Sequence, residues 1–503
     1  MKKALVILLS MVCLSLTAQV PSQCTDVMLQ GFYFGSYNDN GYGDTRWVTL
    51  VRDTADICRD FDLVWLPPSA SSSEDNGYHP AQYSNQNSNR FGSRTLLTQL
   101  ISALHKRNTK VIADIVINHA GNKSSWCDFH QQNFGTYGTF NPNSAWITAS
   151  DEVWTKGPAS CVKSAEANAD DGYGSEANYD SARDWDHKNP NVNEMFKAYL
   201  QWMKSVMQYD GWRYDYCKGF HTSHINDYNQ ASSPYLSVME YWDGSATILK
   251  ARLQEAEYNT MTFDFPGKFT IFNNGIAKNL YNNCRVNGMR GLKLTKYAVT
   301  FIDNHDTFAR NNGSEFCGNN SITTNPNRIL QANAYLLSMP GLPCVFYPHW
   351  VTFKNEISTM IKARKLVGIH SESTVLSEES GNAFYRATIE GLYGTLILKL
   401  GANSGFDETP EGYTCAISGT NYGIFYKRTD DAVTKVTQLD GVYSQGSELH
   451  IDGHEGQQCN IFNISGQLVG SALIDNYSYS VMLPQGLYIV RIGNQTAKIA
   501  ITQ

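Results

Sequence analysis

The chain of 503 residues lacks the features of several protein classes. Its 40 basic and 47 acidic side chains give a formal net charge of −7, so it has no basic excess of the kind that nucleic-acid-binding proteins carry. Beyond the first residues, no run of about 20 apolar residues is present, as a membrane-spanning helix would need. With 42% hydrophobic residues the chain can bury a large core. We therefore expect a globular monomer that acts on an uncharged substrate and binds no nucleic acid.

Cysteine spacing excludes a common type of zinc site, because no CxxC pair occurs among the 11 cysteines. At the N-terminus, two lysines precede a short apolar run over residues 4–16, and Ala18 offers a cleavage position. This is the pattern of a signal peptide, which we assign to residues 1–18. Export permits disulfides, but the spacing gives no pairing, and buried free thiols fit equally well. We expect a secreted or cell-surface protein.

Short apolar runs alternate with amphipathic stretches over the first two thirds of the chain. The strongest predicted strands are residues 63–66, 111–116 and 298–302. The strongest predicted helices are residues 96–106 and 192–209. Continuous apolar strands alternating with helices are typical of a parallel sheet that is covered on both faces. The pattern predicts an α/β fold, a (β/α)8 TIM barrel over residues 19–367. A long segment rich in Gly, Asn and Asp, at about 120–186, predicts an inserted domain after the third strand.

The C-terminal third has a different pattern. Short strand-like runs between residues 368 and 427 predict an antiparallel β domain. Residues 428–440 are polar and charged, and we interpret them as a linker. Residues 441–503 alternate apolar and polar positions between glycine-centred turns, which predicts a small β-sandwich.

Four polar clusters lie where apolar runs end, at residues 114–119, 211–219, 238–242 and 301–306. In a parallel barrel, the carboxyl ends of the strands form the rim on which active sites are built. One such cluster alone could be structural, since an Asp at a strand end often caps a helix. Four clusters in one chain favour an active site.

Two of these clusters carry the carboxyl pair that glycosidic cleavage requires. Arg213 and Asp215 lie two residues apart, on one face of a strand, and the guanidinium favours the ionised form that a nucleophile needs. Glu240 has apolar and aromatic neighbours, which favour the protonated form that a general acid needs. Asp306 is a third carboxylate, able to bind sugar hydroxyls and to keep Glu240 protonated.

In their order and spacing, the four clusters resemble the motifs of the α-amylase family, glycoside hydrolase family 13. The resemblance covers about residues 28–427 and is to plant-type members; residues 29–32, 65–68, 303–307 and 343–347 also support it. It implies that Asp215 is the nucleophile, Glu240 the acid/base and Asp306 the transition-state stabiliser. The substrate-binding residues it implies are Tyr78, His119, Arg213, Lys218, Trp242 and His305.

The resemblance also implies a calcium ion that ties the insert to the barrel. Asn118, Asp184 and the carbonyl of Gly219 are the expected ligands, with Asp180 and Glu176 as further candidates, and Ca²⁺ takes six to eight oxygen ligands. The alternatives are a solvated acidic loop and, for Asp184, a helix cap. The insert is shorter than in plant enzymes, so the number of ions is not predicted.

Two other positions depart from common family patterns. Many members have His where this chain has Gly219, although plant-type members have Gly. The paired surface tryptophans before the fourth motif are absent, since Leu-Thr-Lys-Tyr occupies residues 294–297. Binding of raw starch through that patch is therefore not expected.

The C-terminal residues 460–469 and 483–492 resemble the sorting domain of type IX secretion. This likeness implies passage across an outer membrane, with the secretion machinery as a partner. A carbohydrate-binding β-module is the alternative interpretation.

Together these features predict a secreted, retaining α-amylase. It would cleave internal α-1,4-glucosidic bonds of starch, glycogen and maltooligosaccharides by double displacement. Three alternatives stay open: a maltooligosaccharide-forming exo-enzyme or transglycosylase of the same family, a glycan-binding protein on an amylase-like barrel, and a starch-capture protein that binds through residues 436–503. Because all three carboxyl residues are present, a non-catalytic protein is the weaker alternative.

Overall fold

The computed structural model describes residues 20–39, 41–88, 90–157, 161–177, 179–309, 313–314, 318–319, 325–429, 441–493 and 495–501. The chain divides into two compact units, Met1–Lys427 and Arg428–Gln503. The predicted signal peptide and all but the first two residues of the predicted linker lie outside the described residues.

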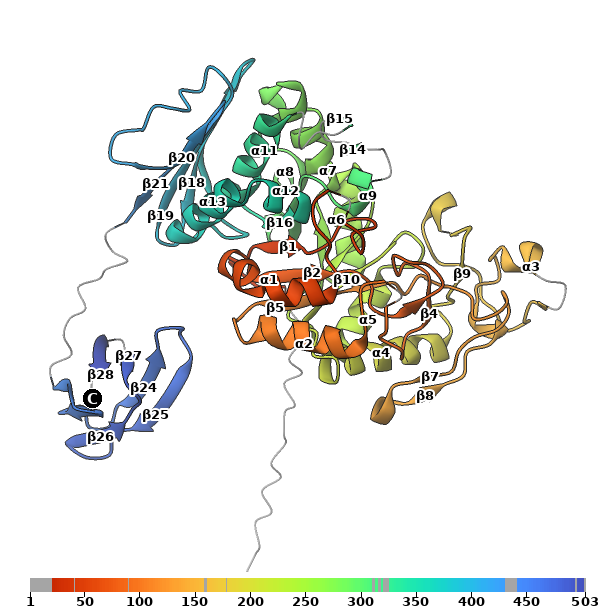
Figure 1. The fold of residues 1–503 in the computed structure, drawn as a ribbon, viewed down its shortest axis with the longest axis horizontal. Helices are drawn as coiled ribbons and strands as arrows, with labels where there is room; N and C mark the ends of the chain where they lie inside the picture. Colours follow the sequence, from red (N-terminus) through yellow and green to blue (C-terminus); the bar gives the residue numbers. More distant parts are fainter. Residues whose placement is uncertain are drawn as a thin grey trace, which may run out of the picture. The chain divides into compact units, whose positions relative to one another are not determined.

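Eight parallel strands form a closed barrel at the centre of the first unit (Figure 1). In barrel order they are β1 Met28–Gln30, β16 Leu342–Phe346, β13 Ala298–Phe301, β12 Met261–Phe263, β11 Ser237–Met239, β10 Gly211–Tyr214, β5 Lys110–Ile115 and β2 Leu63–Leu66. Nearly all of their residues are buried, because helices cover the outside and side chains fill the inside. The predicted fold class is confirmed.

Helices cover the outside of the barrel (Figure 1). The longer ones are α1 Trp47–Asp60, α2 Arg94–His105, α4 Pro190–Ser205, α5 Ser223–Ser232, α6 Ala246–Glu255, α11 Pro326–Ser338 and α13 Lys354–Val367. Local sequence sets where they begin: the Ser93 side chain accepts from the backbone N–H of Leu96 at the start of α2, and Asn189 with Pro190 begins α4. The two helices predicted from periodicity correspond to α2 and α4.

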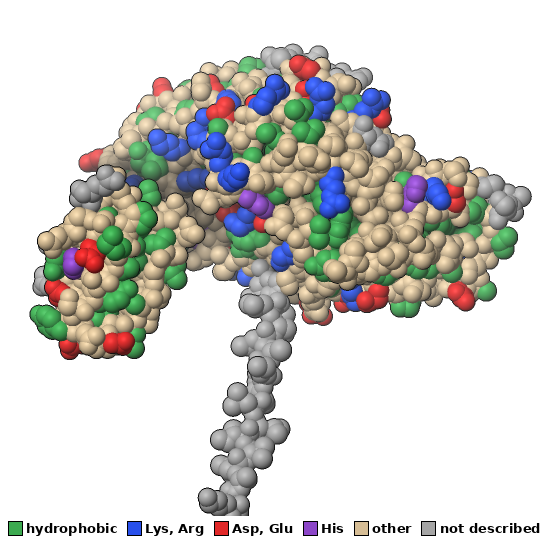
Figure 2. Space-filling model, turned by 60° about the horizontal axis from the view of Figure 1, so that its bottom comes forward, with side chains coloured by type: hydrophobic (Ala, Val, Ile, Leu, Met, Phe, Trp, Pro, Cys, Tyr) green, Lys and Arg blue, Asp and Glu red, His purple; other side chains and the backbone are tan. Residues whose placement is uncertain are grey.

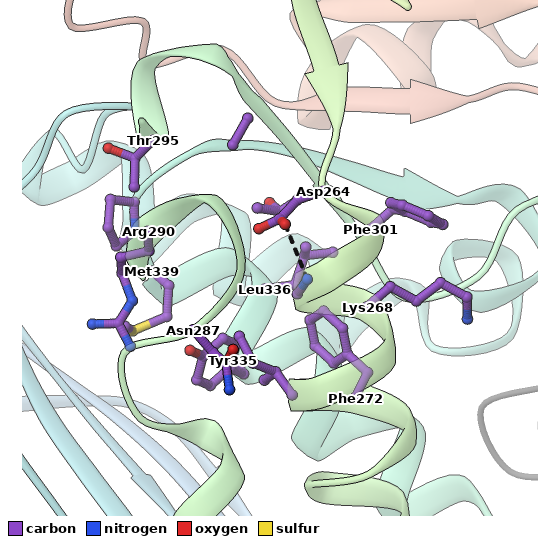
Figure 3. A pocket seen from close by; sticks show the side chains of 15 residues that line it. Asp264, Lys268, Phe272, Asn287, Arg290, Thr295, Phe301, Tyr335, Leu336 and Met339 are labelled. Atoms are coloured by element: carbon purple, nitrogen blue, oxygen red, sulfur yellow. Dashed lines mark hydrogen bonds between the residues drawn. The ribbon is translucent and has the colours of Figure 1, made fainter. Parts of the chain in front are cut away.

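One connection is irregular. Between β12 and β13 the chain forms α7 Phe265–Gly267, a π-helical turn Lys268–Asn273, 3₁₀ turns at Ile276–Lys278, Tyr281–Cys284 and Thr295–Tyr297, and α8 Gly288–Gly291. Together with α11, these segments line a narrow cavity of about 30 Å³ (Figure 3), room for about two or three water molecules. At its edge, Asp264 accepts from the backbone N–H groups of Gly267 and Met289 at 3.0 and 3.1 Å. This cavity is too small for a sugar.

The insert leaves the barrel after β5 and returns before α4. Its two ends are joined where β6 His119–Ala120 pairs with β9 Arg183–Asp184. Within the insert, β7 Gln132–Asn133 pairs with β8 Thr139–Phe140. The short helix α3 spans Val153–Lys156. A disulfide joins Cys127 to Cys161, a pairing that the sequence left open. The other described cysteines are free thiols.

A five-stranded antiparallel sheet completes the first unit. Its order is β17 Val375–Gly381, β18 Phe384–Gly391, β19 Gly394–Leu400, β21 Tyr422–Arg428 and β20 Thr414–Gly419. Arg290 pairs with Glu378 of β17 at 2.6 Å, and the Tyr385 hydroxyl donates to the same carboxylate. This mostly buried ion pair ties the sheet to the barrel.

The second unit is a small β-sandwich with its own core. One sheet contains β22 Val442–Gln445, β23 Glu448–Asp452 and β26 Ser478–Met482; the other contains β25 Leu468–Leu473, β24 Gln458–Asn463, β27 Gly486–Ile492 and β28 Gln495–Ile501. Buried residues of both sheets, including Leu449, Ile461 and Val490, form the core. Apolar side chains also lie on its surface (Figure 2), among them Leu468, Leu473, Met482, Leu487 and Ile489. Among the described residues of the whole chain, no helix combines the length and apolar character needed to cross a membrane.

Candidate active site

One buried arginine at the end of β10 brings three carboxyl groups together. Arg213 is inaccessible to solvent, and its Nη1 lies 2.8 Å from Asp114 Oδ1 and 2.5 Å from Asp215 Oδ1. Its Nη2 lies 2.7 Å from Glu240 Oε1. The Trp65 ring packs against the guanidinium, 5.0 Å from the ring centroid. Because β5, β10 and β11 are neighbours in the barrel, their ends place these acids around one positive charge.

This geometry changes the electrostatic argument made from the sequence. The sequence predicts that Arg213 acts on Asp215, but Arg213 also contacts Glu240, at 2.7 Å against 2.5 Å for Asp215. Burial raises the pKa of both carboxyls to about 7, and the charge of Arg213 opposes the rise in each case. Arg213 therefore does not by itself make one acid a nucleophile and the other a proton donor. The two carboxyls form a coupled pair that can hold one proton between them near neutral pH.

Asp114 is a member of the cluster whose contacts were not predicted. It accepts hydrogen bonds from Trp65 Nε1 at 3.1 Å and from the Tyr78 hydroxyl at 2.9 Å, besides its contact with Arg213. Burial raises its pKa to about 6. Asp114 thus anchors both the arginine and the tyrosine.

A cavity of about 290 Å³ opens above this cluster. Its lining comes from the barrel rim and from the insert, and consists of Tyr78, His119, Tyr179, Asp215, Tyr216, Lys218, Glu240, Trp242, His305 and Asp306. The three predicted catalytic residues and five of the six predicted substrate-binding residues therefore share one cavity. The sixth, Arg213, lies beneath it.

Hydrogen bonds orient the two histidines of the cavity. His119 Nε2 donates to the Tyr78 carbonyl at 2.8 Å, and burial lowers the pKa of this imidazole to about 3, so it stays neutral. His305 accepts from Gln30 Nε2 at its Nδ1, 2.9 Å away. Its ring stacks on Tyr78 with 5.2 Å between centroids, so the tyrosine and both histidines form one packed wall.

The insert contributes an aromatic residue that the sequence analysis missed. Tyr179 stacks on His119 with 4.1 Å between ring centroids and an angle of 11°, and its hydroxyl lies 3.2 Å from His79 Nε2. The ring of Tyr216, whose backbone is left-handed with φ 48°, meets Tyr179 edge-on at 5.1 Å. Only the fold brings Tyr179 to the cavity, since its local sequence is an ordinary polar loop.

Lys218 and Trp242 also line the cavity. Lys218 Nζ lies 5.8 Å from the centroid of the Tyr241 ring. Trp242 packs on Phe265, which follows β12, at 4.6 Å. Both predicted substrate-binding residues therefore rest on aromatic neighbours.

The predicted calcium ligands Asn118, Asp184 and Gly219 come together at the base of the insert. Asn118 Nδ2 donates to Asp184 Oδ1 at 3.2 Å, and both residues are 1% exposed. Asn118 Oδ1 is buried and has no hydrogen-bond partner among the described residues. A Cβ at Gly219 would lie 1.8 Å from that oxygen, so only glycine fits there. A buried oxygen without a donor, beside a carboxylate, fits a hard cation such as Ca²⁺.

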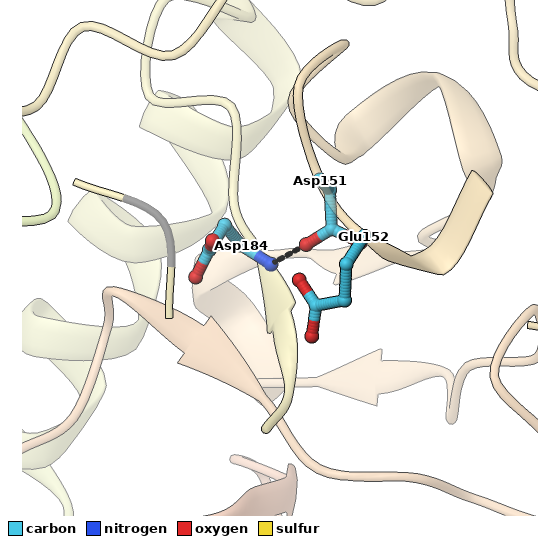
Figure 4. Close-up of side chains that lie close together, drawn as sticks. All are labelled: Asp151, Glu152 and Asp184. Atoms are coloured by element: carbon cyan, nitrogen blue, oxygen red, sulfur yellow. Dashed lines mark hydrogen bonds between the residues drawn. The ribbon is translucent and has the colours of Figure 1, made fainter. Parts of the chain in front are cut away.

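Three acids of the insert lie close together near this site. Asp151, Glu152 and Asp184 each place a carboxylate oxygen within 4.8 Å of the others (Figure 4). Asp180, in contrast, has a side chain that is 75% exposed and pairs with Lys156 at 3.6 Å, so it does not join this group. The side chain of Glu176 lies outside the described residues. Asp151 and Glu152 were not predicted, because nothing in their polar surroundings distinguishes them from solvated acids.

Comparisons with known proteins show what the chain is similar to. Residues 60–263 match the family of α-amylase catalytic domains. Chloroplastic α-amylase 3 of Arabidopsis thaliana is 28% identical over 430 residues, 80% of this chain, and the chain spans 44% of that protein's length. The α-amylase type B isozyme of Hordeum vulgare is 34% identical over 133 residues, 26% of this chain and 80% of that protein.

The same architecture occurs in solved structures. An α-amylase from Geobacillus thermoleovorans, solved in complex with acarbose, has a TM-score of 0.55 at 16% sequence identity. The match covers 94% of this chain and 99% of that one. At this identity the likeness shows the shared fold.

Proposed function

This chain belongs to the α-amylase family of glycoside hydrolases acting on α-glucans, and from that premise we propose that it is a retaining endo-α-amylase. It would cleave internal α-1,4-glucosidic bonds of starch, glycogen and maltooligosaccharides. The proposal rests on one observation: Asp215, Glu240 and Asp306 line the same cavity.

The carboxyl groups of Asp215 and Glu240 are held close together by Arg213, which supports double displacement. Two nitrogens of one guanidinium contact Asp215 and Glu240, and retaining glycosidases need two such groups close together, about 5–5.5 Å apart. In the first step Asp215 forms a bond to the anomeric carbon, while Glu240 gives its proton to the departing glycosidic oxygen. In the second step Glu240 takes a proton from water, and the water oxygen displaces Asp215. The first step needs Asp215 ionised and Glu240 protonated; the second starts with Asp215 bonded to the sugar and Glu240 ionised, and it restores both groups to their initial states.

The other cavity residues would bind and orient the sugar. Asp306 would accept hydrogen bonds from sugar hydroxyls, and its charge opposes ionisation of Glu240. The neutral His119 and the stacked pair Tyr78–His305 would present an aromatic wall to the sugar, and His305, whose Nδ1 accepts from Gln30, would offer an N–H donor at its Nε2. Lys218 and Trp242 would contact the sugar on the other side.

We also propose that calcium binds at the base of the insert. Asn118, Asp184 and the carbonyl of Gly219 would hold the ion, because the buried Asn118 oxygen has no other described partner. Bound calcium would supply positive charge that stabilises the buried carboxylates. These residues belong to the barrel and to the insert, so the site would keep the insert, and with it Tyr179, in place over the cavity.

The test is cleavage of soluble starch and of a blocked maltooligosaccharide by the wild type and by Asp215→Asn. We expect the wild type to lower starch viscosity well before most bonds are cut, and to release the α-anomer first as seen by NMR. Asp215→Asn should be inactive. Asp227→Asn, an exposed position on α5, is the matched control and should keep full activity.

Three outcomes would contradict the proposal in different ways. Viscosity that falls only in proportion to released short products would indicate an exo-enzyme. An initial β-anomer would refute retention. Starch binding without cleavage by the wild type would refute the catalytic assignment.

We further propose that the protein is exported, and that residues 441–503 direct passage across an outer membrane. A β-sandwich with a core of its own and a disulfide in the insert, as proteins in oxidising compartments form, support this. Expression in a host with type IX secretion should place the full chain outside the cell, whereas a chain ending at residue 428 should stay in the periplasm. Equal release of both chains would refute the sorting role.

A further inference from the structure

We propose that Lys268 is a positioning residue for the reaction, and that it acts on Asp306 through the buried carboxylate of Asp303. The inference rests on the proposed function, in which Asp306 binds the sugar beside Asp215 and Glu240. Lys268 lies on the π-helical turn after β12, outside the four polar clusters at the strand ends. It is not one of the residues that line the substrate cavity, so it can act only through others.

The amino group of Lys268 contacts the two residues that follow β13. Lys268 is fully buried, which is rare for a lysine unless its charge is paired. Its Nζ donates to the Ile302 carbonyl at 2.8 Å and to Asn273 Oδ1 at 3.3 Å, and it lies 3.7 Å from Asp303 Oδ1. Figure 3 shows the side chain directed away from Arg290.

The π-helical turn Lys268–Asn273 gives the lysine its polar partner. In a π-helix, hydrogen bonds join residues five apart, so the side chains of Lys268 and Asn273 can meet on one side of the turn. In an α-helix the neighbours would be the residues three and four positions later, and these are the apolar Ile271 and Phe272. The irregular turn therefore orients the amino group toward the end of β13.

Asp303 connects three elements of the barrel. It is 1% exposed, and a buried carboxylate is costly without a positive charge or hydrogen-bond donors. Lys268, from the connection after β12, supplies a positive charge. Asp303 Oδ2 lies 3.3 Å from Nε2 of His349, on the short helix α12 Tyr347–Thr352 that follows β16. Asp303 Oδ1 accepts from the Thr307 hydroxyl at 3.2 Å.

Hydrogen bonds continue from Asp303 to Asp306. The Thr307 hydroxyl, which donates to Asp303, also accepts the backbone N–H of Asn304 at 3.0 Å. The Asn304 side chain accepts the backbone N–H groups of Asp306 and Thr307 at 3.1 and 2.9 Å. The chain from Asp303 to Thr307 is therefore one hydrogen-bonded turn, and the lysine holds its first residue.

The buried ion pair supplies a fixed direction, which apolar packing lacks. Burial takes both charges out of water, and apolar side chains of similar volume often stabilise a fold as well or better. Stability alone therefore does not explain Lys268 and Asp303. A carboxylate that stabilises developing charge has to be in place before the reaction begins, and the turn held by this pair carries such a carboxylate, Asp306.

The test is a double-mutant cycle between Lys268 and Asp306. Values of kcat and KM for a blocked maltooligosaccharide are measured for the wild type, Lys268→Met, Asp306→Asn and the variant with both changes. We expect Lys268→Met to lower kcat about 10- to 100-fold, as for a small displacement of a catalytic group, with little change in KM. The variant with both changes should be no slower than Asp306→Asn alone.

Arg290→Met is the matched control. Arg290 belongs to the same connection, lines the same small cavity as Lys268 and forms a mostly buried ion pair, but its partner is Glu378 of the C-terminal sheet. This variant should have a lower melting temperature and the kcat of the wild type. Lys268→Met combined with Asp303→Asn covers the case in which Lys268→Met does not fold, because no unpaired carboxylate is left; its kcat should also be lowered.

Three results would overturn the inference. A wild-type kcat in both Lys268 variants, with Asp306→Asn impaired, would refute it and leave the proposed function standing. Losses of Lys268→Met and Asp306→Asn that multiply in the combined variant, or an equal loss in Arg290→Met, would show that Lys268 does not act through Asp306. A wild-type kcat in Asp306→Asn would refute the role of Asp306 in the proposed function, and this inference with it.

Discussion

Replacing Arg213 tests how the cavity sets the protonation of its acids. In Arg213→Met, the carboxyls of Asp114, Asp215 and Glu240 lose the guanidinium that contacts all three. A methionine fills much of the same volume, so the change is mainly one of charge. Without the positive charge, the protonated form of each acid is favoured.

The size of the effect follows from the geometry. A unit charge about 4 Å from a carboxylate, at an effective dielectric of 20, contributes about 4 kcal/mol, which corresponds to a pKa rise of about 3. Asp215 must be ionised to attack. We therefore expect the profile of kcat/KM against pH to move upward by about 2 to 3 pH units, and activity at pH 7 to fall about 100- to 1,000-fold. The free energy of unfolding should fall by about 3–5 kcal/mol, as when one partner of a buried ion pair is removed.

The assay is hydrolysis of a blocked maltooligosaccharide from pH 4 to 10, with urea unfolding measured in parallel. Arg364→Met is the matched control, because Arg364 is equally buried but, within the described part of the chain, donates only to the carbonyls of Leu337, Met339 and Gly341. It should lose stability with an unshifted pH profile. Arg213→Lys keeps the charge and covers the case in which the methionine variant does not fold; its profile should move less. An unshifted or downward-shifted profile for both Arg213 variants would refute the reasoning.

Three further predictions concern single features. Wild-type activity should fall as pH rises above about 7, because Glu240, whose pKa is raised to about 7, then loses the proton that it must donate; activity that holds to pH 9 would contradict this. Gly219→Ala should lower the melting temperature, measured by calorimetry, and weaken calcium binding, measured by dialysis, because the added Cβ would meet Asn118 Oδ1 at 1.8 Å. The control Gly291→Ala has open space around its Cβ and should change neither quantity. Cys127→Ser should lower the free energy of unfolding of the insert by about 3–4 kcal/mol, as expected for a loop of 34 residues; equal protease resistance of the variant and the wild type would contradict it.

Much of the fold could be predicted because its signals are local. The strand Leu63–Leu66 is a continuous apolar run, and the helix Pro190–Ser205 combines amphipathic periodicity with an Asn-Pro start. A parallel barrel buries its strands on both sides, so composition alone identifies them. The connection between β12 and β13 carries no such regular signal, and the 3₁₀ and π turns there were not predicted.

The candidate site, like the fold, could be predicted from the sequence only in part. Asp215, Glu240 and Asp306 follow strands, and the carboxyl ends of parallel strands meet at one rim, so their meeting in one cavity follows from the order of the motifs. The contact of Arg213 with both Asp215 and Glu240 does not follow from the order of the motifs. It depends on which strands are neighbours in the barrel and on how far the arginine side chain reaches across them.

The sequence by itself determined the barrel, the inserted domain and the acids on the barrel rim, since each depends on a pattern within a few residues. Only the tertiary structure decided the partner of Cys127, the place of Tyr179 in the cavity wall and the burial of Glu152 with Asp184. These three features lie in the insert, where polar loops without periodicity take their shape from contacts between residues distant in sequence. Such contacts leave no local trace, because a solvated acid and a buried ligand have the same neighbours along the chain.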